Sequence, residues 1–600
     1  MIKLTFLKSV SFLFVLSVIL TSCQQKQSNE QEDNKKPEGN AISVSYNESA
    51  DPSPIDESLW ADIPQGLHGS FGTPDERYPK HLPIVTPKNM KWNATGWKGE
   101  RIHTQVVLWT KEDEHTLTYE IGGFKDQNGA TISANQTQLR FVKYVLTDEF
   151  SDGCGKRNKE DYAVSLVADV LDIATIINME NNSVRPVWVS IDIPENTISG
   201  TYLNEIKINS SKGDQVVFNI ELTVQDQVLP QPSEWSYHLD LWQNPYAVAR
   251  VHNVKAWSDE HWGYLEPMLK MLASAGQKCV TTSIIHHPWD GQTVDPFDEM
   301  IKWTKKTDGS WEYDYSVFDR WVEFAEKCGI TQQINCYSMV PWHMRFRYFN
   351  EATNSFEELE TKTGTEEFNN HWRPFLQNFW MHLKEKNWQD KTVIAMDERP
   401  MEAMKSVIKL IKETSPDLKI ALAGEFHEEI QDDIFDLCVA SKEIVPKEDI
   451  MQRNKKGNFT TYYTCCVEAY PNNFTFSPPA ESAWQGWYAA SKGFDGYLRW
   501  AYNSWVKEPL LDSRFRTWPA GDTYMVYPGA RSSIRFERIR EGIQDYEKIR
   551  ILKEKLSTDK LEELNNVLAT FKLEALSNQP AGEMVNKGKD VINKISEELN

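Results

Sequence analysis

The chain has 600 residues, of which 40% are hydrophobic and 25% charged, as in ordinary folded proteins with roughly two to four domains. Its net charge of −22 argues against a nucleic-acid-binding protein, which needs a basic patch, and against electrostatic adhesion to anionic lipid. The 22 Trp residues favour carbohydrate binding, because flat indole faces pack against sugar rings, although large cores also use Trp.

Residues 1–23 have the features of a targeting segment. Two lysines precede the apolar run 10–20, which is too short to span a bilayer, and the segment ends in Leu-Thr-Ser-Cys at Cys23. This ending resembles a bacterial lipobox and predicts lipidation of Cys23, with a plain secretory signal as the alternative. Residues 24–40 are almost free of apolar side chains and predict a disordered tether. We therefore expect a lipid-anchored protein in the envelope of a Gram-negative-type bacterium, with the lipid as its only membrane attachment.

Residues 41–228 predict an antiparallel β-sandwich. Segments that alternate apolar and polar residues are separated by Gly, Asn, Ser or Pro, without amphipathic helices between them. The clearest predicted strands are residues 102–109, 117–121, 185–191, 202–208 and 216–224. Such a domain either binds carbohydrate or packs against a catalytic domain, and we favour packing.

Residues 229–556 repeat a pattern of strand, loop and helix, after a boundary at the Leu-Pro-Gln-Pro sequence 229–232. The eight predicted strands are residues 237–242, 279–285, 333–339, 392–396, 419–423, 434–439, 459–465 and 496–502. Helical segments separate most of them, including residues 261–274, 315–327, 365–386 and 401–413. This repeat predicts a (β/α)₈ barrel.

A doubly wound sheet is the alternative to the barrel, but no Gly-rich phosphate loop follows any predicted strand. A helix near residues 534–556 is expected to close the ring. Residues 557–600 predict a charged, moderately amphipathic helical segment after the barrel.

Seven Cys residues follow Cys23, and no C-x-x-C pair occurs among them. Most lie within predicted strands or helices, where a free Cys packs as a small hydrophobic residue. We therefore predict no disulfide framework and no zinc site.

Asp397 and Glu398 stand where the fourth predicted barrel strand ends. Barrel enzymes carry their chemistry at the C-terminal ends of the strands, and adjacent like charges resist burial. The Asp-Glu dipeptide occurs elsewhere in the chain, and an acid at a strand-to-helix junction is often only a helix cap. Its strand-end setting in an aromatic-rich repeat favours a catalytic role.

Consecutive carboxylates suit substrate-assisted hydrolysis of a 2-acetamido sugar better than the ordinary retaining mechanism, in which the two carboxyl groups flank the bond about 5 Å apart. In this interpretation Glu398 is the general acid/base on the glycosidic oxygen. Asp397 orients the substrate acetamide, whose carbonyl oxygen attacks the anomeric carbon and forms an oxazolinium ion. One carboxyl group must then be protonated while its neighbour is ionised, and the anomeric configuration is retained.

The other strand ends offer aromatic, acidic and imidazole side chains of the kinds that bind sugars. From them we predict substrate contacts by Asp240, Trp242, His287, Tyr337, Tyr463, Trp500 and Tyr502. The adjacent histidines at residues 286 and 287 do not chelate a metal readily, and no third ligand is placed by spacing. No G-x-S-x-G nucleophile motif occurs either.

Three features of the chain together resemble glycoside hydrolase family 123. They are the strand end Ala-Met-Asp-Glu-Arg-Pro at residues 395–400, the order of sandwich and barrel, and the sequence Arg-Phe-Glu-Arg-Ile-Arg-Glu-Gly-Ile-Gln-Asp-Tyr-Glu at residues 535–547. The resemblance covers most of the chain after residue 41. It implies an exo-acting β-N-acetylgalactosaminidase that needs no cofactor and acts on terminal β-linked GalNAc of a glycan or glycolipid. It also implies an acetamide pocket, for which we expect Tyr463, Trp500 and Tyr502.

Two other interpretations stay open from the sequence. A β-N-acetylglucosaminidase, or an enzyme that accepts both epimers, would use the same mechanism, because selectivity at C4 depends on a few hydrogen bonds that spacing does not place. A lectin-like surface lipoprotein is the alternative from another class, but a binding protein has no need for an acid beside an ionised carboxylate.

Overall fold

The computed structural model describes residues 46–599 except 85–86, 114, 150–152 and 156–157. The predicted signal segment, the tether and Cys23 therefore lie outside the described residues. Within the part of the chain that is described, no helix is both long enough and apolar enough to cross a membrane.

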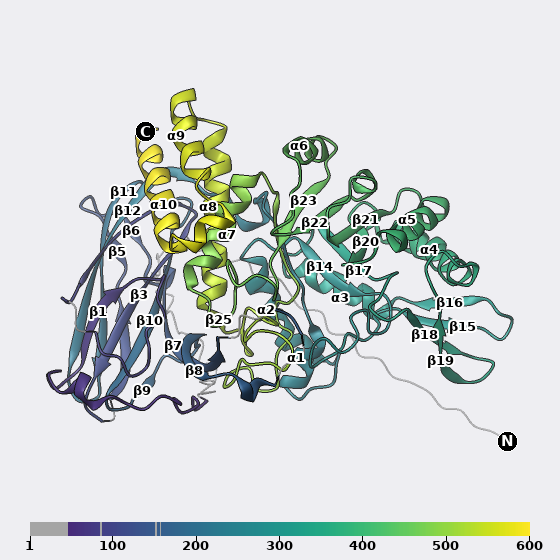
Figure 1. The fold of residues 1–600 in the computed structure, drawn as a ribbon. Helices are drawn as coiled ribbons and strands as arrows, with labels where there is room; N and C mark the ends of the chain where they lie inside the picture. Colours follow the sequence, from purple (N-terminus) through teal and green to yellow (C-terminus); the bar gives the residue numbers. More distant parts are fainter. Residues whose placement is uncertain (1–45, 85–86, 114, 150–152, 156–157, 600) are drawn as a thin grey trace, which may run out of the picture. The chain divides into compact units, whose positions relative to one another are not determined.

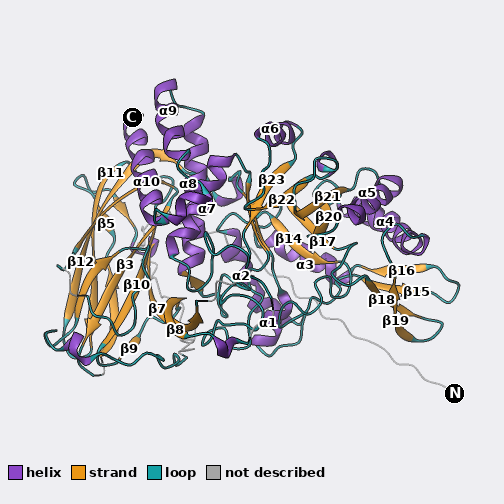
Figure 2. Ribbon diagram, viewed as in Figure 1, coloured by secondary structure: helices purple, strands orange, loops and turns teal. Residues whose placement is uncertain are grey.

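Two β-sheets form the N-terminal domain and pack face to face, as predicted (Figure 2). The first contains, in order, β1 (His68–Gly72), β3 (Arg101–Thr110), β10 (Ser183–Asp192), β7 (Thr137–Asp148), β8 (Val164–Leu171) and β25 (Ser532–Ser533). The second contains β2 (Lys91–Lys98), β12 (Gln215–Val228), β11 (Gly200–Ser210), β4 (His115–Ile121) and β9 (Ile177–Met179), with β5 (Phe124–Lys125) beside β11 and β6 (Thr131–Ile132) beside β5. The strand pairs are antiparallel as predicted, except β2–β12, which is parallel. Alternate residues of both sheets, such as Val106 and Phe218, form one apolar core.

Eight parallel strands form the second domain in the circular order β13-β24-β23-β22-β21-β20-β17-β14. They are β13 (His238–Leu241), β14 (Cys279–Ser283), β17 (Gln333–Tyr337), β20 (Thr392–Asp397), β21 (Lys419–Gly424), β22 (Asp436–Ala440), β23 (Phe459–Tyr463) and β24 (Gly496–Arg499). The ring nearly closes between β13 and β14, where Lys278 donates its backbone N–H to Leu239 at 3.0 Å. All eight predicted strands are found, so the barrel is confirmed and the doubly wound sheet is not.

Helices cover the outside of the barrel; most carry one apolar stripe that packs on the strands, whereas α7 and α8 are buried on nearly all sides. They are α1 (Pro245–Val251), α2 (Asp259–Ala273), α3 (Ser316–Lys327), α4 (Glu366–Lys386), α5 (Met401–Thr414), α6 (Lys447–Lys455), α7 (Pro479–Lys492) and α8 (Ile534–Lys553). In α3, for example, Phe318, Trp321 and Val322 are buried while the intervening charged residues face outward. Thr365 is the N-cap of helix α4, and its side chain accepts the backbone N–H of Phe368.

A four-stranded sheet that we did not predict projects beside the barrel (Figure 1). It contains β15 (Lys302–Lys305), β16 (Trp311–Asp314), β18 (Arg345–Asn350) and β19 (Ser355–Glu360). These strands interrupt the loops that follow β14 and β17. Their sequences are short and largely polar on one face, so they resemble loop sequence.

The chain ends in α9 (Thr558–Leu568) and α10 (Ala581–Glu598), the predicted helical segment. Helix α10 joins the two domains: the indole N–H of Trp97 in β2 donates to Ser596 at 3.1 Å, and Gln227 in β12 donates to the Ser596 carbonyl at 2.8 Å. Strand β25, which directly precedes α8, extends the first sandwich sheet. The sandwich is therefore packed against the barrel over several elements.

The expectation of no disulfide is wrong. Cys154, in a sandwich loop, is bonded to Cys466, in the loop after barrel strand β23, across 312 residues of sequence. No spacing motif signals this bond, because the two residues meet only where the domains do. Among the described cysteines, Cys279, Cys328, Cys336 and Cys438 are free and buried, while Cys465 is free and partly exposed.

Candidate active site

Asp397 is the last residue of β20, and Glu398 follows it in a left-handed backbone conformation with φ of 48°. The backbone N–H of Glu398 donates to the Ala423 carbonyl at 2.7 Å, which ties this turn to the end of β21. A Cβ on Gly424 would meet the Glu398 backbone at 3.4 Å, and φ at Gly424 is +155°, so glycine suits this close approach. The turn sends the two neighbouring carboxyl groups to different sides.

Asp397 points toward the loops that follow β14 and β17. Its Oδ2 accepts the indole N–H of Trp342 at 3.2 Å, and the Arg399 guanidinium lies 4.7 Å from the centre of the Trp342 ring. Burial raises the pKa of Asp397 to about 7, and the charge of Glu398 adds to the rise; hydrogen bonds from Trp342 and Trp289 and the charge of Arg399 oppose it. Helix α5 begins after Pro400 without a side-chain cap, so Asp397 is not a helix cap.

Glu398 points the other way, toward the ends of β21, β22 and β23. Its Oε1 accepts the hydroxyl hydrogen of Tyr463 at 2.7 Å, and the Glu398 side chain is exposed to a cavity of about 410 Å³. Burial and the Glu398 charge raise the pKa of Tyr463, so the phenol stays a donor at all ordinary pH values. The hydrogen bond leaves the second oxygen of Glu398 available for a proton that can be transferred.

Three aromatic rings form a buried floor beneath Asp397. The ring of Trp242 lies 5.0 Å from that of Trp289 and 4.7 Å from that of Tyr337, and the rings of Trp289 and Tyr337 are also 4.7 Å apart. They pack on the small strand residues Val393 and Ala395 in one apolar cluster. This floor lowers the polarity around Asp397, which explains the raised pKa of its carboxyl group.

The structure brings five of the seven predicted substrate residues to the barrel mouth or its floor. Trp242 and Tyr337 belong to the buried floor, and Tyr463 contacts Glu398 directly. His287 lies in the loop that carries Trp289 and stacks on His286 at 3.5 Å. Trp500 follows β24 and is partly exposed, with its ring 5.7 Å from that of Trp518.

Asp240 and Tyr502 lie elsewhere. Asp240 is inside the barrel and 3% exposed, and its Oδ2 accepts hydrogen bonds from the Asn335 amide at 2.9 Å and the Trp242 indole at 3.2 Å. Tyr502 is 1% exposed and donates its hydroxyl to the Met268 carbonyl of α2 at 3.0 Å. Strand β24 ends at Arg499, so the residues after it no longer alternate as in a strand, and Tyr502 packs in the helix layer outside the barrel.

Trp289, Trp342 and Arg399 contribute to the site but were not among the predicted substrate residues. Trp289 and Trp342 follow β14 and β17, so their strand-end position was the available signal. Arg399 lies within the strand-end motif itself. Nothing in the spacing indicates that the loop after β17 reaches across to the carboxyl group of Asp397.

Three groups of potential metal ligands occur among the described residues, and internal contacts already engage them. His238 lies 3.1 Å from Asp436 and 3.4 Å from Cys279 inside the barrel. The second group contains His286, His287 and Asp298, and the Nδ1 of His286 lies 2.7 Å from the Asp298 carboxylate. The third group contains the disulfide-bonded pair and Cys465.

A parallel eight-stranded barrel whose mouth holds a strand-end carboxyl pair among indoles and a phenol has the architecture and side chains of a glycoside hydrolase. Comparison with known families agrees: residues 242–552 match the catalytic domain of glycoside hydrolase family 123, and residues 71–210 match the N-terminal domain of the same family. The chain therefore belongs to glycoside hydrolase family 123.

Among solved structures, the chain is similar to a family 123 glycoside hydrolase from Clostridium perfringens, described in a study of glycolipid glycan hydrolysis. The identity is 29%, the TM-score is 0.82, and the match covers 89% of this chain and 99% of that one. A xyloglucanase of family 5 from Bacteroides ovatus matches at 8% identity with a TM-score of 0.25, covering 76% of this chain and 98% of that one. No match is found among the curated proteins.

Proposed function

We propose that the protein is an exo-acting, retaining β-N-acetylgalactosaminidase that uses the 2-acetamido group of its substrate as the nucleophile. The observation that carries the proposal is the divergent pair at the end of β20. Asp397 is held by Trp342 on one side, and Glu398 is held by Tyr463 on the other. A sugar above the aromatic floor would have its acetamide beside Asp397 and its glycosidic oxygen beside Glu398.

In the first step, the ionised Asp397 accepts the acetamide N–H and so increases the electron density on the acetamide carbonyl oxygen. That oxygen attacks the anomeric carbon while Glu398 transfers its proton to the leaving oxygen, which gives a cyclic oxazolinium ion and the free leaving group. In the second step, Glu398 takes a proton from water, and the water oxygen attacks the anomeric carbon from the face that the leaving group left. The bond between the anomeric carbon and the acetamide oxygen breaks, which restores the acetamide. Two inversions give net retention.

The proton count of the pair fits this cycle. Burial, and secondarily the charge of Glu398, raises the pKa of Asp397 to about 7, so the pair still holds a proton as the pH falls below about 7. The reactive arrangement has that proton on Glu398 and the negative charge on Asp397. The indole N–H of Trp342 favours this arrangement, because a hydrogen-bond donor stabilises the ionised form of Asp397.

The proposed substrate is a glycan or glycolipid with terminal β-linked GalNAc. The Clostridium perfringens enzyme was studied for glycolipid glycan hydrolysis, which supports this class of substrate. Hydrolysis of β-linked GlcNAc by the same mechanism is the alternative. The proposed mechanism needs only two carboxyl side chains and the acetamide of the substrate, so no cofactor is proposed. We further propose that Cys23 carries a lipid that holds the enzyme in a bacterial cell envelope, from the lipobox-like sequence before it.

The test is hydrolysis of three aryl β-glycosides, those of GalNAc, GlcNAc and galactose, by the protein without residues 1–23. We expect cleavage of the GalNAc compound and none of the galactose compound, which lacks the acetamide nucleophile. Cleavage of the GlcNAc compound alone would favour the alternative substrate. Equal cleavage of the galactose compound would refute acetamide participation, and cleavage of none would favour a binding protein.

A further inference from the structure

The cavity beside Glu398 lies on one side of the catalytic pair only. It has a volume of about 410 Å³, within the range of ligand-binding pockets. Its walls come from the ends of β20, β21, β22 and β23 and the loops after them. Glu398 lines the cavity, whereas Asp397 does not and instead contacts Trp342.

This asymmetry indicates what the cavity receives. The general acid must reach the oxygen of the leaving group, and the acetamide of the cleaved sugar must reach Asp397. Given the proposed mechanism, on which this step rests, the cleaved sugar lies over the aromatic floor. The leaving group then extends past Glu398 into the cavity.

The lining of the cavity suits a saccharide. A phenol, an imidazole and an amine, from Tyr463, His427 and Lys442, face the same space as the apolar Pro400 and Val467. Sugars present both hydroxyl groups and C–H faces, so they use both kinds of surface. A lipid chain would instead require a continuous apolar wall.

One wall of the cavity is the segment after β23, which contributes Cys465, Val467 and Glu468. Internal hydrogen bonds hold its shape: the Asn472 amide donates to the carbonyls of Cys465 and Glu468, both at 2.7 Å. The carboxylate of Glu468 accepts the Cys465 backbone N–H and the Ser441 hydroxyl, each at 2.9 Å. Glu468 is therefore a support of the wall.

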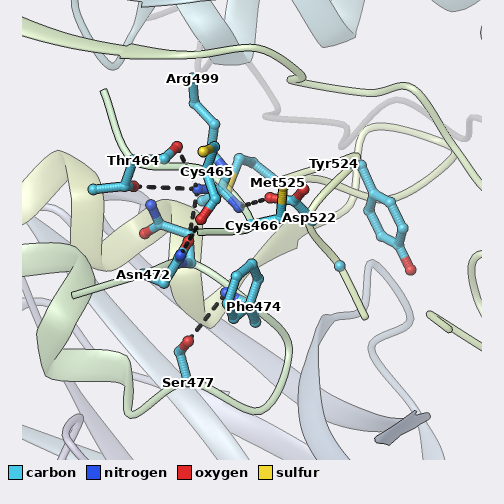
Figure 3. A network of polar contacts seen from close by, with 12 residues as sticks. Thr464, Cys465, Cys466, Asn472, Phe474, Ser477, Arg499, Asp522, Tyr524 and Met525 are labelled. Carbon is cyan, nitrogen blue, oxygen red and sulfur yellow. Dashed lines mark hydrogen bonds and ion pairs between the residues drawn. The ribbon is translucent and has the colours of Figure 1, made fainter. Parts of the chain in front are cut away.

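A fully buried ion pair lies beneath this segment and contacts it through Asn472 (Figure 3). Arg499 pairs with Asp522 at 2.6 Å and donates to the side-chain oxygen of Asn472 at 2.9 Å. At the start of the segment, Arg499 also donates to the Thr464 hydroxyl at 3.4 Å, so one buried side chain contacts both ends of the segment. Val467, at its exposed tip, is 51% exposed.

The disulfide bond holds the same segment at the residue next to its exposed tip. Cys466 stands between two lining residues, Cys465 and Val467, and its bond to Cys154 ties the segment to the sandwich. We propose that the cavity is the leaving-group subsite, that it takes a saccharide, and that the sandwich shapes it through the Cys154–Cys466 disulfide. The N-terminal domain then contributes to substrate selection in addition to packing.

The test compares two substrates that share the cleaved sugar. One is an aryl β-GalNAc glycoside, and the other is an oligosaccharide ending in β-GalNAc, whose sugar leaving group fills the cavity. We measure kcat/KM on both for the wild type and for the Cys154→Ala/Cys466→Ala double variant. We expect the double variant to lose about tenfold or more on the oligosaccharide, mainly through KM, because a displaced wall misplaces the leaving group. The aryl glycoside should be cleaved at nearly the wild-type rate.

Two controls separate the bond from the substitutions. Wild-type protein treated with a phosphine reductant should show the same selective loss, with mass spectrometry confirming that Cys154 and Cys466 are linked only before treatment. Cys328→Ala, which removes a free thiol at the end of α3, should leave both substrates unaffected. Equal loss on both substrates, no loss on either, or unlinked cysteines in the untreated protein would overturn the inference. Failure of the wild type to cleave the aryl glycoside would instead refute the proposed function.

Discussion

The substitution Trp342→Phe tests the electrostatic role of a single N–H group. It removes the donor to Oδ2 of Asp397 but keeps an aromatic ring beneath the guanidinium of Arg399. A hydrogen bond to a charged group contributes about 1.5–3 kcal/mol, and about 1.4 kcal/mol corresponds to a tenfold change in rate. Because the reactive state needs Asp397 ionised, we expect kcat/KM for an aryl β-GalNAc glycoside to fall by about 10- to 150-fold.

A pH profile of the same variant distinguishes this role from simple damage to the fold. Loss of the donor raises the pKa of Asp397 further above its starting value of about 7, so the alkaline limb of kcat/KM should move to higher pH. The matched control is Trp380→Phe on α4, where the indole packs near Lys384 on the surface. A Trp342→Phe enzyme within about twofold of the wild type, with an unmoved limb, would refute the reasoning.

Three further predictions concern Glu398, Asp397 and Tyr502, the last of which was expected to bind substrate but packs outside the barrel. Glu398→Gln keeps an oxygen acceptor for Tyr463 but has no acidic proton to transfer. The value of kcat/KM should therefore fall by about 10²–10⁴-fold on substrates with poor leaving groups and by less on activated aryl glycosides, and equal loss on both would count against Glu398 as the general acid. Wild-type kcat/KM should decrease as the pH rises through about 7, where the carboxyl pair loses its last proton. Asp397→Asn should lower the rate on all substrates and remove the limb near pH 7, because the group with the raised pKa is gone; a limb that stays near pH 7 would exclude Asp397 as its source. Tyr502→Phe should leave kcat and KM unchanged. It should lower the free energy of unfolding, measured by urea denaturation, by about 1 kcal/mol, because the hydrogen bond to Met268 is lost; a large rise in KM would instead show that Tyr502 contacts the substrate.

The barrel was predictable because its strands are continuous apolar runs, and each run is bounded by loops. Residues 392–396, for example, all become buried in β20, and their position fixes that of Asp397. The same reasoning failed at Tyr502, because the predicted strand extended past Arg499, where β24 ends. Side-chain direction beyond a strand end depends on the loop path, which alternation does not describe.

Contacts between segments that lie far apart in the sequence could not be predicted either. Trp342 reaches Asp397 from a loop 55 residues earlier, and Cys154 reaches Cys466 from another domain. Neither contact leaves a spacing signal, because each depends on how two elements pack. Asp240 shows the converse: its strand position was right, but a residue on the inner face can point into the barrel core below the mouth.

The central claim is that the substrate acetamide is the nucleophile and that Asp397 directs it. The most direct measurement is the rate on aryl β-GalNAc glycosides whose acetyl group carries none, one, two or three fluorine atoms. Fluorine withdraws electrons from the acetamide oxygen, so kcat/KM should fall steeply with each added atom, and the slope should flatten in Asp397→Asn. A rate that does not depend on fluorine would contradict acetamide participation and the role of Asp397 with it.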